Sequence, residues 1–374
     1  MASFLFRLAN TFSGRGRAIA ASAALIFLGA ITWRADACTT FSLNQTSEKI
    51  MGKSYDWHIA DGMVVVNKRN VKKTAFAPLP AVTTATWISK YGSVTFNQYG
   101  REFPNGGINE KGLAVEVMVL NETKYPSAFT FLPKVNELQW VQYQLDKYAT
   151  VQEVIDHVDE LRIAKVMAKL HYLVCESSGI CASIEWLNGV PVVHTGDALP
   201  LAVLTNSTYS ASTDRLKSFE GFGGKLPLPS GSLKSLDRFV NTAANVKYFR
   251  PDHGAAVPQG FLMLNDVKSE KSSQWQIVYE VANGRAHFRS LTFPEIKTFS
   301  TRTFDYDCRT PVKILDMDQA TGGEVTGKFV DYTPAANRRL LDKTLKGDLP
   351  GFVVAKGAAY PETTTCLSLE NPRS

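Results

Sequence analysis

A processing signature at residues 35–38 limits where the folded part of this chain can begin. Arginines precede a 16-residue uncharged run, 18–33, and the tripeptide Ala35-Asp36-Ala37 stands directly before Cys38. A basic segment, an apolar run and an A-x-A tripeptide are typical of a secretory signal. The run is shorter than the roughly 18 to 20 apolar residues that a spanning helix needs, which disfavours an uncleaved anchor. We therefore expect cleavage after Ala37 and export, either to the periplasm or out of the cell.

The processed chain would have 337 residues and a small net charge. The charge falls from +6 to +3 because the leader carries four Arg and one Asp, and no run of Lys or Arg remains. This disfavours a nucleic-acid partner. The sequence has no C-x-x-C or H-E-x-x-H motif and its six histidines are scattered, so we expect no metal and no cofactor. Without an internal repeat or linker, residues 38–374 are expected to form a single domain.

The order of hydrophobic patterns predicts an α+β fold. Runs of strands alternate with pairs of helices rather than in a regular β-α-β series, which favours largely antiparallel sheets covered by helices. Thr150 and Glu153 form a capping-box signature, Pro334 suits the first turn of a helix, and Asn283-Gly284 marks a hairpin. The expected strands are 39–43, 50–57, 63–67, 85–96, 113–120, 171–175, 181–186, 201–204, 274–282 and 285–291. The expected helices are 135–148, 151–161, 235–248 and 334–345.

Four cysteines differ from Cys38 in their surroundings. Cys175 and Cys181 flank a Ser-Ser-Gly turn between two apolar strands, and Cys308 and Cys366 lie near the C-terminus. An oxidising compartment would allow both pairs to form disulfides. Sequence alone does not fix the pairing, and buried free thiols are the alternative.

A cysteine at the start of a processed chain has its own base. The α-amino group titrates near pH 8, so a fraction is free to accept the thiol proton. Two other interpretations remain open. Cys38 would be acylated in a lipid-anchored envelope binding protein, although Asp36 fits that processing pattern poorly. Alternatively, a cysteine hydrolase would use a separate histidine, for which the candidates are His58, His171, His194 and His253.

Five short motifs occur together in the first two thirds of the chain. They are C-T-T-F (38–41), G-K-S-Y-D-W (52–57), G-I-N-E-K-G-L (107–113), L-T-N-S (204–207) and S-L-D-R-F (235–239). In order and spacing they resemble the choloylglycine hydrolase family, which includes penicillin V acylases and conjugated bile salt hydrolases. The resemblance implies the four-layer αββα fold of N-terminal nucleophile hydrolases, and hydrolysis of a linear, non-peptide amide C–N bond.

The resemblance assigns roles to individual residues. Cys38 matches the family's nucleophile, Asp56 an Asp near its amine and thiol, Asn206 an oxyanion donor, and Arg238 an Arg of the active-site network. Lys53 stands where many members have Arg, so its charge is kept but the planar fork is lost. This departure puts penicillin V and bile salts in doubt as the specific substrates.

The remaining assignments concern the substrate and the assembly. Trp57 and Val119 are candidates for an apolar acyl pocket, although core packing explains them equally well. Asn109 has the residue chemistry of a hairpin turn, so we assign it to structure. From the resemblance, the partner is a small acyl amide such as a phenoxyacetyl β-lactam, a bile acid conjugate or an N-acyl homoserine lactone. The family's tendency to form tetramers predicts a homo-oligomer.

Overall fold

The protein is described here by a computed structural model that covers residues 38–76, 83–127, 131–250, 255–345 and 351–367. The leader, 1–37, and His253 lie outside the described residues, so the processing prediction is not addressed by the fold. None of the described helices has both the length and the apolar character to cross a membrane.

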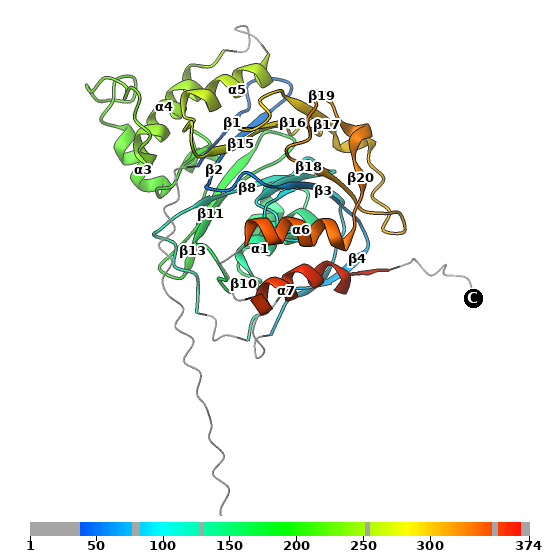
Figure 1. Ribbon diagram of the computed structural model, residues 1–374. Coiled ribbons are helices and arrows are strands. Elements are labelled where there is room, and N and C mark those ends of the chain that lie inside the picture. Colours follow the sequence, from blue (N-terminus) through cyan, green and yellow to red (C-terminus); the bar gives the residue numbers. More distant parts are fainter. Residues whose placement is uncertain (1–37, 77–82, 128–130, 251–254, 346–350, 368–374) are drawn as a thin grey trace, which may run out of the picture. The chain divides into compact units, whose positions relative to one another are not determined.

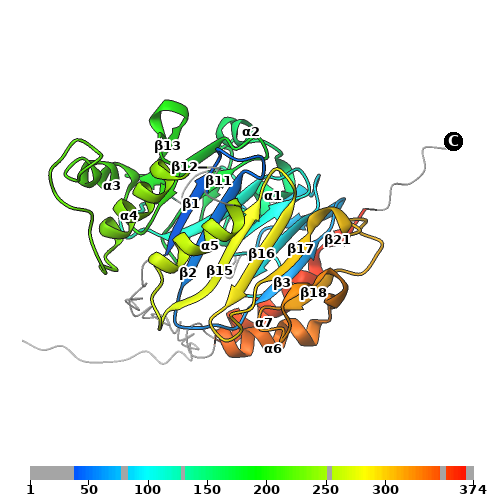
Figure 2. The ribbon, with the colours of Figure 1, turned by 90° about the horizontal axis from the view of Figure 1, so that it is seen from above.

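Two large sheets form the centre of the described chain (Figures 1 and 2). The first sheet has the strand order β14-β1-β2-β15-β16-β17-β19, and the second has the order β13-β12-β11-β8-β7-β6-β3-β18-β20. All neighbouring strands in both sheets are antiparallel except β17 and β19. The first sheet comprises β1 (Thr39–Leu43), β2 (Ile50–Asp56), β14 (Val203–Leu204), β15 (Ser273–Glu280), β16 (Arg285–Ser290), β17 (Lys297–Ser300) and β19 (Gly323–Glu324). The second comprises β3 (Met63–Asn67), β6 (Ser93–Asn97), β7 (Gly106–Asn109), β8 (Ala114–Val119), β11 (Leu170–Cys175), β12 (Cys181–Leu187), β13 (Val190–Thr195), β18 (Lys313–Asp316) and β20 (Val330–Asp331).

Helices cover the outer faces of both sheets and complete the four layers (Figure 1). Helices α4 and α5 pack on the first sheet, and α1 packs on the second. Between the sheets, the Phe96 ring lies 5.9 Å from that of Tyr279 and 5.4 Å from that of Phe288. The helices are α1 (Glu137–Lys147), α2 (Val151–Asp156), α3 (Tyr209–Leu216), α4 (Ser235–Tyr248), α5 (Ala256–Asp266), α6 (Pro334–Thr344) and α7 (Gly351–Ala359). The predicted α+β, αββα architecture is thereby confirmed.

The first sheet lies between a helix layer and the second sheet, and this explains why polar residues of its strands are buried. Every residue of β1, T-T-F-S-L, and of β2, I-M-G-K-S-Y-D, is buried. A half-exposed strand would alternate between buried and exposed positions. Here both faces are covered, so the Lys, Asp, Ser and Thr side chains of these strands have to find partners inside the protein.

Local signals predicted most elements, with two instructive differences. Helix α4 has the predicted bounds, the capping box at Thr150 is formed, and Thr333 caps the Pro334 helix. The expected strand 85–96 is instead β5 (Thr86–Ile88) and β6, because the chain turns at Lys90 and Tyr91, whose N–H groups both donate to the Asp146 carbonyl. The hairpin of β15 and β16 is confirmed, but its loop spans four residues, 281–284.

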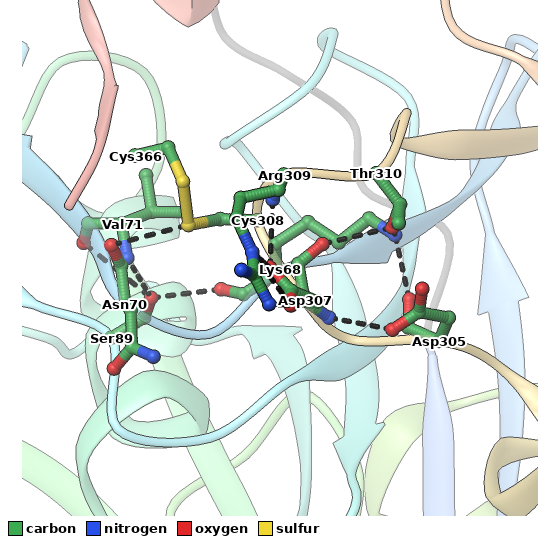
Figure 3. The surroundings of a disulfide bond; sticks show 10 residues. All are labelled: Lys68, Asn70, Val71, Ser89, Asp305, Asp307, Cys308, Arg309, Thr310 and Cys366. Atoms are coloured by element: carbon green, nitrogen blue, oxygen red, sulfur yellow. Dashed lines mark hydrogen bonds and ion pairs between the residues drawn. A yellow bond between two sulfur atoms is a disulfide. The ribbon is translucent and has the colours of Figure 1, made fainter. Parts of the chain in front are cut away.

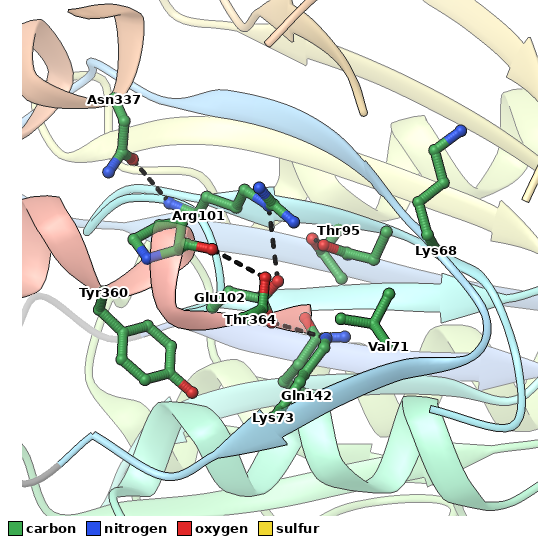
Figure 4. A network of polar contacts seen from close by, with 12 residues as sticks. Lys68, Val71, Lys73, Thr95, Arg101, Glu102, Gln142, Asn337, Tyr360 and Thr364 are labelled. Carbon is green, nitrogen blue, oxygen red and sulfur yellow. Dashed lines mark hydrogen bonds and ion pairs between the residues drawn. The ribbon is translucent and has the colours of Figure 1, made fainter. Parts of the chain in front are cut away.

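A buried ionic cluster joins Lys73 and Glu102 to helix α1, which carries Asp146 (Figure 4). The Lys73 ammonium lies 2.6 Å from Glu102 and 3.0 Å from Asp146, and all three side chains are buried. Trp87 also donates to Asp146, at 2.8 Å. Asn337 of α6 accepts the N–H of Arg101 at 2.8 Å, which ties the C-terminal helices to the same region. Burial of these charges requires that each be paired.

Both cysteine pairs are disulfides in the structure. Cys175 and Cys181 face each other across β11 and β12, and Cys308 bonds to Cys366 (Figure 3). The second bond fastens the short C-terminal strand β21 (Thr365–Cys366), which pairs with β4 (Val71–Thr74). The two bonds close loops of very different length, with sequence separations of 6 and 58.

This difference makes a stability prediction. In the chain-entropy description, removing a disulfide costs more when the closed loop is longer. A variant with Cys308→Ser and Cys366→Ser should lose about 4 kcal/mol of unfolding free energy, whereas Cys175→Ser with Cys181→Ser should lose about 2 kcal/mol. Urea denaturation of the oxidised proteins measures both values. Equal losses in the two variants would contradict this explanation.

Candidate active site

Strand register brings the sequence-predicted residues Cys38, Asp56 and Asn206 together. Strand β1 lies between β2 and β14, with Thr39 opposite Ser54 and Thr40 opposite Leu204. Continuing this antiparallel register by one or two residues places Cys38 beside Asn206 on one side and beside the end of β2 on the other. Three segments that are distant in sequence therefore meet at one edge of the first sheet.

The Cys38 thiol is enclosed and is held by the main chain of Asp56. Its side chain is only 3% exposed, and it is the one free cysteine among the described residues. The Asp56 N–H donates to Sγ at 3.5 Å, and Sγ lies 3.8 Å from the Asp56 carbonyl oxygen. Burial raises the pKa of the Cys38 thiol, and the positive charge of Lys53 opposes that rise. The thiol therefore needs a base in order to react at neutral pH.

The Asp56 carboxylate is fully buried and receives four hydrogen bonds. Oδ1 accepts from Ser54 Oγ at 2.8 Å and from Ser273 Oγ at 2.6 Å. Oδ2 accepts from both terminal nitrogens of Arg238, at 2.7 and 2.8 Å. These contacts compensate the desolvation of the charge and fix the orientation of the carboxylate.

Helix α4 braces the site through two side chains on one face. Ser235 and Arg238 are three residues apart, so both point the same way from the helix. Ser235 Oγ accepts a hydrogen bond from the main-chain N–H of Asn206 at 2.9 Å. Arg238 reaches Asp56 and also donates through Nε to Thr39 Oγ1 at 3.2 Å. The first turn of α4 thus positions the β14 and β2 sides of the site together.

The side-chain amide of Asn206 uses only part of its hydrogen-bonding capacity. Nδ2 donates one N–H to the Val119 carbonyl at 2.8 Å, which leaves the second N–H of the same amide to serve another acceptor. Oδ1 is buried and has no hydrogen-bond partner among the described residues. The amide is therefore oriented by the end of β8 without being saturated.

Alternation along β2 gives the site two different sides. Ser54 and Asp56 face α4, whereas Lys53 faces the second sheet, where its ammonium donates to the Val117 carbonyl. Lys53 Nζ also lies 3.9 Å from Glu116 Oε2, and both side chains are buried. Lys53 makes no hydrogen bond to Cys38, so it acts on the thiol through its charge.

The two residues predicted to line an acyl pocket lie near this cluster in different ways. Trp57 directly follows Asp56, is buried, and donates its main-chain N–H to the Ser272 carbonyl at 2.7 Å. Val119 is partly buried and contacts the site through its carbonyl, which holds Asn206. Their role toward a substrate stays a prediction.

Two other expectations concern Asn109 and the histidines. Asn109 Oδ1 accepts the N–H groups of Lys111 and Leu113, so the turn prediction is confirmed. His171 is buried between Glu185, at 3.0 Å, and the Thr205 carbonyl, at 2.7 Å, while His194 contacts Ser183. Neither of these two rings is bonded to Cys38.

Several members of the site are not among the residues predicted from the sequence. Thr39 and Ser54 lie inside the C-T-T-F and G-K-S-Y-D-W motifs, and alternation along the strand with Asp56 would assign Ser54 to the same face. Ser273 is 217 residues from Asp56 and follows no local signal. Only the pairing of β15 with β2, where Ser273 lies opposite Asp56, brings it to the carboxylate.

Known proteins resemble this chain in sequence and in fold. Residues 38–223 match the family described as linear amide C-N hydrolases, choloylglycine hydrolase family. The penicillin V acylase of Pectobacterium atrosepticum is 28% identical over 295 residues, which are 66% of this chain and 77% of that protein. The penicillin V acylase structure from Agrobacterium tumefaciens superimposes with a TM-score of 0.68 at 25% identity, covering 79% of this chain and 98% of the other. A conjugated bile acid hydrolase from Clostridium perfringens shares the fold, with a TM-score of 0.63 at 15% identity over 76% of this chain and 98% of the other.

The Arg238–Asp56 pair leads to a stability prediction. Arg238→Met leaves a buried carboxylate without its cation and should cost about 3–5 kcal/mol of unfolding free energy. Arg238→Lys keeps the charge but loses the planar fork, so an intermediate loss is expected.

The matched control is the exposed pair of Arg338 and Asp342, which lie one helical turn apart at 2.8 Å. Arg338→Met should cost no more than about 0.5 kcal/mol, because solvent screens an exposed pair. Chemical denaturation gives all three values. Similar losses for Arg238→Met and Arg338→Met would show that the buried pair does not hold the site together.

Proposed function

We propose that this chain is a linear amide C–N hydrolase of the choloylglycine hydrolase and penicillin V acylase type, and that Cys38, as the first residue of the processed chain, is its nucleophile; the matches to that family and to penicillin V acylases support the proposal. The observation that carries the proposal is the position of the free thiol. Cys38 directly precedes β1, is buried, and contacts the main chain of Asp56, whose carboxylate is held by Arg238.

The base is the α-amino group that cleavage after Ala37 would create. Burial raises the pKa of the thiol, so proton removal needs a group close to sulfur. A terminal amine on the same residue is within reach, directly or through one water, and titrates near pH 8. Asp56, oriented by Ser54, Ser273 and Arg238, supplies negative charge near the ammonium that results.

The reaction follows in two steps. Sulfur transfers its proton to the amine and attacks the carbonyl carbon. The C–N bond then breaks, and the leaving amine takes the proton from the terminal ammonium. A water next gives a proton to the terminal amine and attacks the thioester. Breakage of the C–S bond releases the acid, and the proton returns to sulfur.

Asn206 stabilises the oxyanion of both tetrahedral intermediates. Its amide is oriented by the Val119 carbonyl and retains a second N–H. A preorganised amide donor of this kind is worth roughly 3 kcal/mol of barrier. Arg238 acts as a positioning residue, because it holds Asp56 and Thr39 on either side of the thiol.

The substrate we propose is a neutral amide with an apolar acyl group, such as a phenoxyacetyl or longer acyl amide. Two relatives are penicillin V acylases, which supports the phenoxyacetyl side of this range. Trp57 and Val119 are the residues proposed to contact the acyl group. We further propose that the enzyme is exported, acts in the periplasm or outside the cell, and assembles as a homo-oligomer.

Mass spectrometry of the mature N-terminus tests the processing step on which this proposal depends. A free Cys38 supports it, whereas a diacylglyceryl mass would identify the lipid-anchored alternative and an intact leader would overturn both. The contacts of Sγ with Asp56 favour the enzyme, because an anchor needs its thioether outside the fold.

Substitution of the nucleophile is a direct test. Cys38→Ser should lower amide hydrolysis by several orders of magnitude while the urea midpoint stays close to that of the parent, because the weaker hydroxyl nucleophile has to use the same amine. Turnover is measured on phenoxyacetyl and long-chain acyl amides after the N-terminus has been verified. Comparable turnover with unchanged sensitivity to thiol reagents would remove Cys38 from the mechanism.

The amine is tested by adding one residue before Cys38. The addition converts the basic amine into an amide that accepts no proton, so hydrolysis should be abolished. Trimming the added residue with an aminopeptidase should restore it, which makes one preparation its own control. Full activity in a protein shown by sequencing to keep the extra residue would exclude the amine as base.

A further inference from the structure

Glu116 lies at the centre of the fold, on the opposite side of Lys53 from the Asp56 cluster. It belongs to β8 of the second sheet and is 1% exposed. Its Oε1 accepts the Tyr279 hydroxyl at 2.6 Å, and its Oε2 lies 3.9 Å from Lys53 Nζ. The comparisons and the motifs assign no role to this carboxylate, although it is the nearest anion to the lysine that acts on the thiol.

The chain makes room for this carboxylate with a glycine. Gly106 lies directly opposite Glu116 in the pairing of β7 with β8. A Cβ atom on Gly106 would lie 2.2 Å from Glu116 Oε1 and 2.3 Å from its carboxyl carbon, closer than any real contact. The carboxylate is therefore fitted against a bare backbone, which fixes its position toward Lys53 and Tyr279.

The polar groups that face Glu116 come from two strands. Strand β2 contributes Lys53 and Tyr55, and β15 contributes Tyr279. The neighbours across β7 and β11, Gly106 and Leu173, carry no charge. On the other side of Lys53 lies the Cys38 thiol. Asp56 and Arg238 also act on the ionisation of this thiol, as would a free terminal amine.

The Lys53 charge acts on the Cys38 thiol, and Glu116 is the carboxylate that faces Lys53. Burial raises the pKa of Glu116 to about 7, while Lys53 and the Tyr279 hydroxyl oppose the rise. Glu116 therefore changes charge near neutral pH. When Glu116 is protonated, the Lys53 charge is uncompensated and favours the thiolate. When Glu116 is ionised, it offsets Lys53 and the thiolate is less favoured.

We propose that Glu116 is a positioning residue for the hydrolysis, whose charge, acting through Lys53, sets how readily Cys38 forms the reactive thiolate. The inference rests on the proposed role of Cys38 as nucleophile. It adds that the buried Lys53–Glu116 pair sets the ionisation of that nucleophile, besides contributing to the core.

The test is the pH dependence of Cys38 alkylation by iodoacetamide in the processed enzyme. Glu116→Gln keeps the size of the side chain and an acceptor for Tyr279 but removes the charge. Below about pH 6 the parent also carries a neutral Glu116, so both proteins should react at similar rates. At pH 8 the variant should react about three- to tenfold faster, equivalent to a thiol pKa lower by about half to one unit.

Two further variants locate the effect. In a Lys53→Met background, Glu116→Gln should leave the alkylation profile unchanged, because without the Lys53 charge burial keeps the Glu116 carboxyl protonated and it carries no charge to remove. The matched control is Glu185→Gln, which removes another fully buried carboxylate of the second sheet that bonds to His171 and not to Lys53. Its profile should coincide with that of the parent. If the Lys53→Met protein does not fold, Tyr279→Phe replaces it, because loss of the hydroxyl should keep Glu116 protonated to higher pH and shift the profile in the same direction as Glu116→Gln.

The outcomes separate the inference from the proposed function. Coincident profiles for the parent and Glu116→Gln, or slower alkylation of the variant at pH 8, would overturn the inference while the Cys38→Ser result stands. Conversely, a fully active Cys38→Ser protein would refute the nucleophile, although the alkylation profiles would still report whether Glu116 acts on the thiol.

Discussion

The buried pair of Asp56 and Arg238 is the interaction on which the site depends. A carboxylate with no solvent exposure is stable only when its charge is matched, and Arg238 supplies two hydrogen bonds to one of its oxygens. Arg238 comes from α4, whose first turn also holds Asn206 through Ser235. Docking of α4 on the first sheet and assembly of the site are therefore the same event. A shift of the helix would remove the partner of Asp56 and displace Asn206 together.

Two ion pairs lie near the thiol, one on each face of the first sheet, because successive side chains of β2 point to opposite faces. On the helix side, Asp56 is matched by Arg238, and on the inter-sheet side Lys53 is matched by Glu116. Only one of these pairs is geometrically tight, with bonds of 2.7 and 2.8 Å against a separation of 3.9 Å. The tight pair fixes geometry, whereas the loose pair leaves charge available to act on Cys38. A lysine suits the second task, since its ammonium is a compact charge that also satisfies the Val117 carbonyl.

Sequence predicted what is local and missed what depends on pairing between distant segments. Helix α4, the Thr150 capping box and the hairpin of β15 and β16 follow from neighbouring residues. Cys38, Asp56, Asn206 and Arg238 were found because each lies in a recognisable motif. Ser273 and Glu116 carry no such signal, because they reach the site only through contacts of distant strands with β2: β15 lies more than two hundred residues away in sequence and β8 more than sixty. The split of 85–96 was missed for the same reason, since the Asp146 carbonyl that binds the turn lies on α1.

Charge pairing also limits how this site can accelerate a reaction. Of the two buried cations at the site, Arg238 is bonded to Asp56 and Lys53 donates to the Val117 carbonyl, so neither is placed to donate a hydrogen bond to the oxyanion of a tetrahedral intermediate. That task is left to dipoles, and the uncommitted N–H of Asn206 is the donor that the geometry offers. A dipole favours negative charge without attracting a charged ground state, and it needs no proton to be moved. The same balance disfavours recognition of an ionised acyl group close to the thiol, because the cations that would bind it are occupied. These electrostatics support the substrate proposed above, a neutral amide with an apolar acyl group.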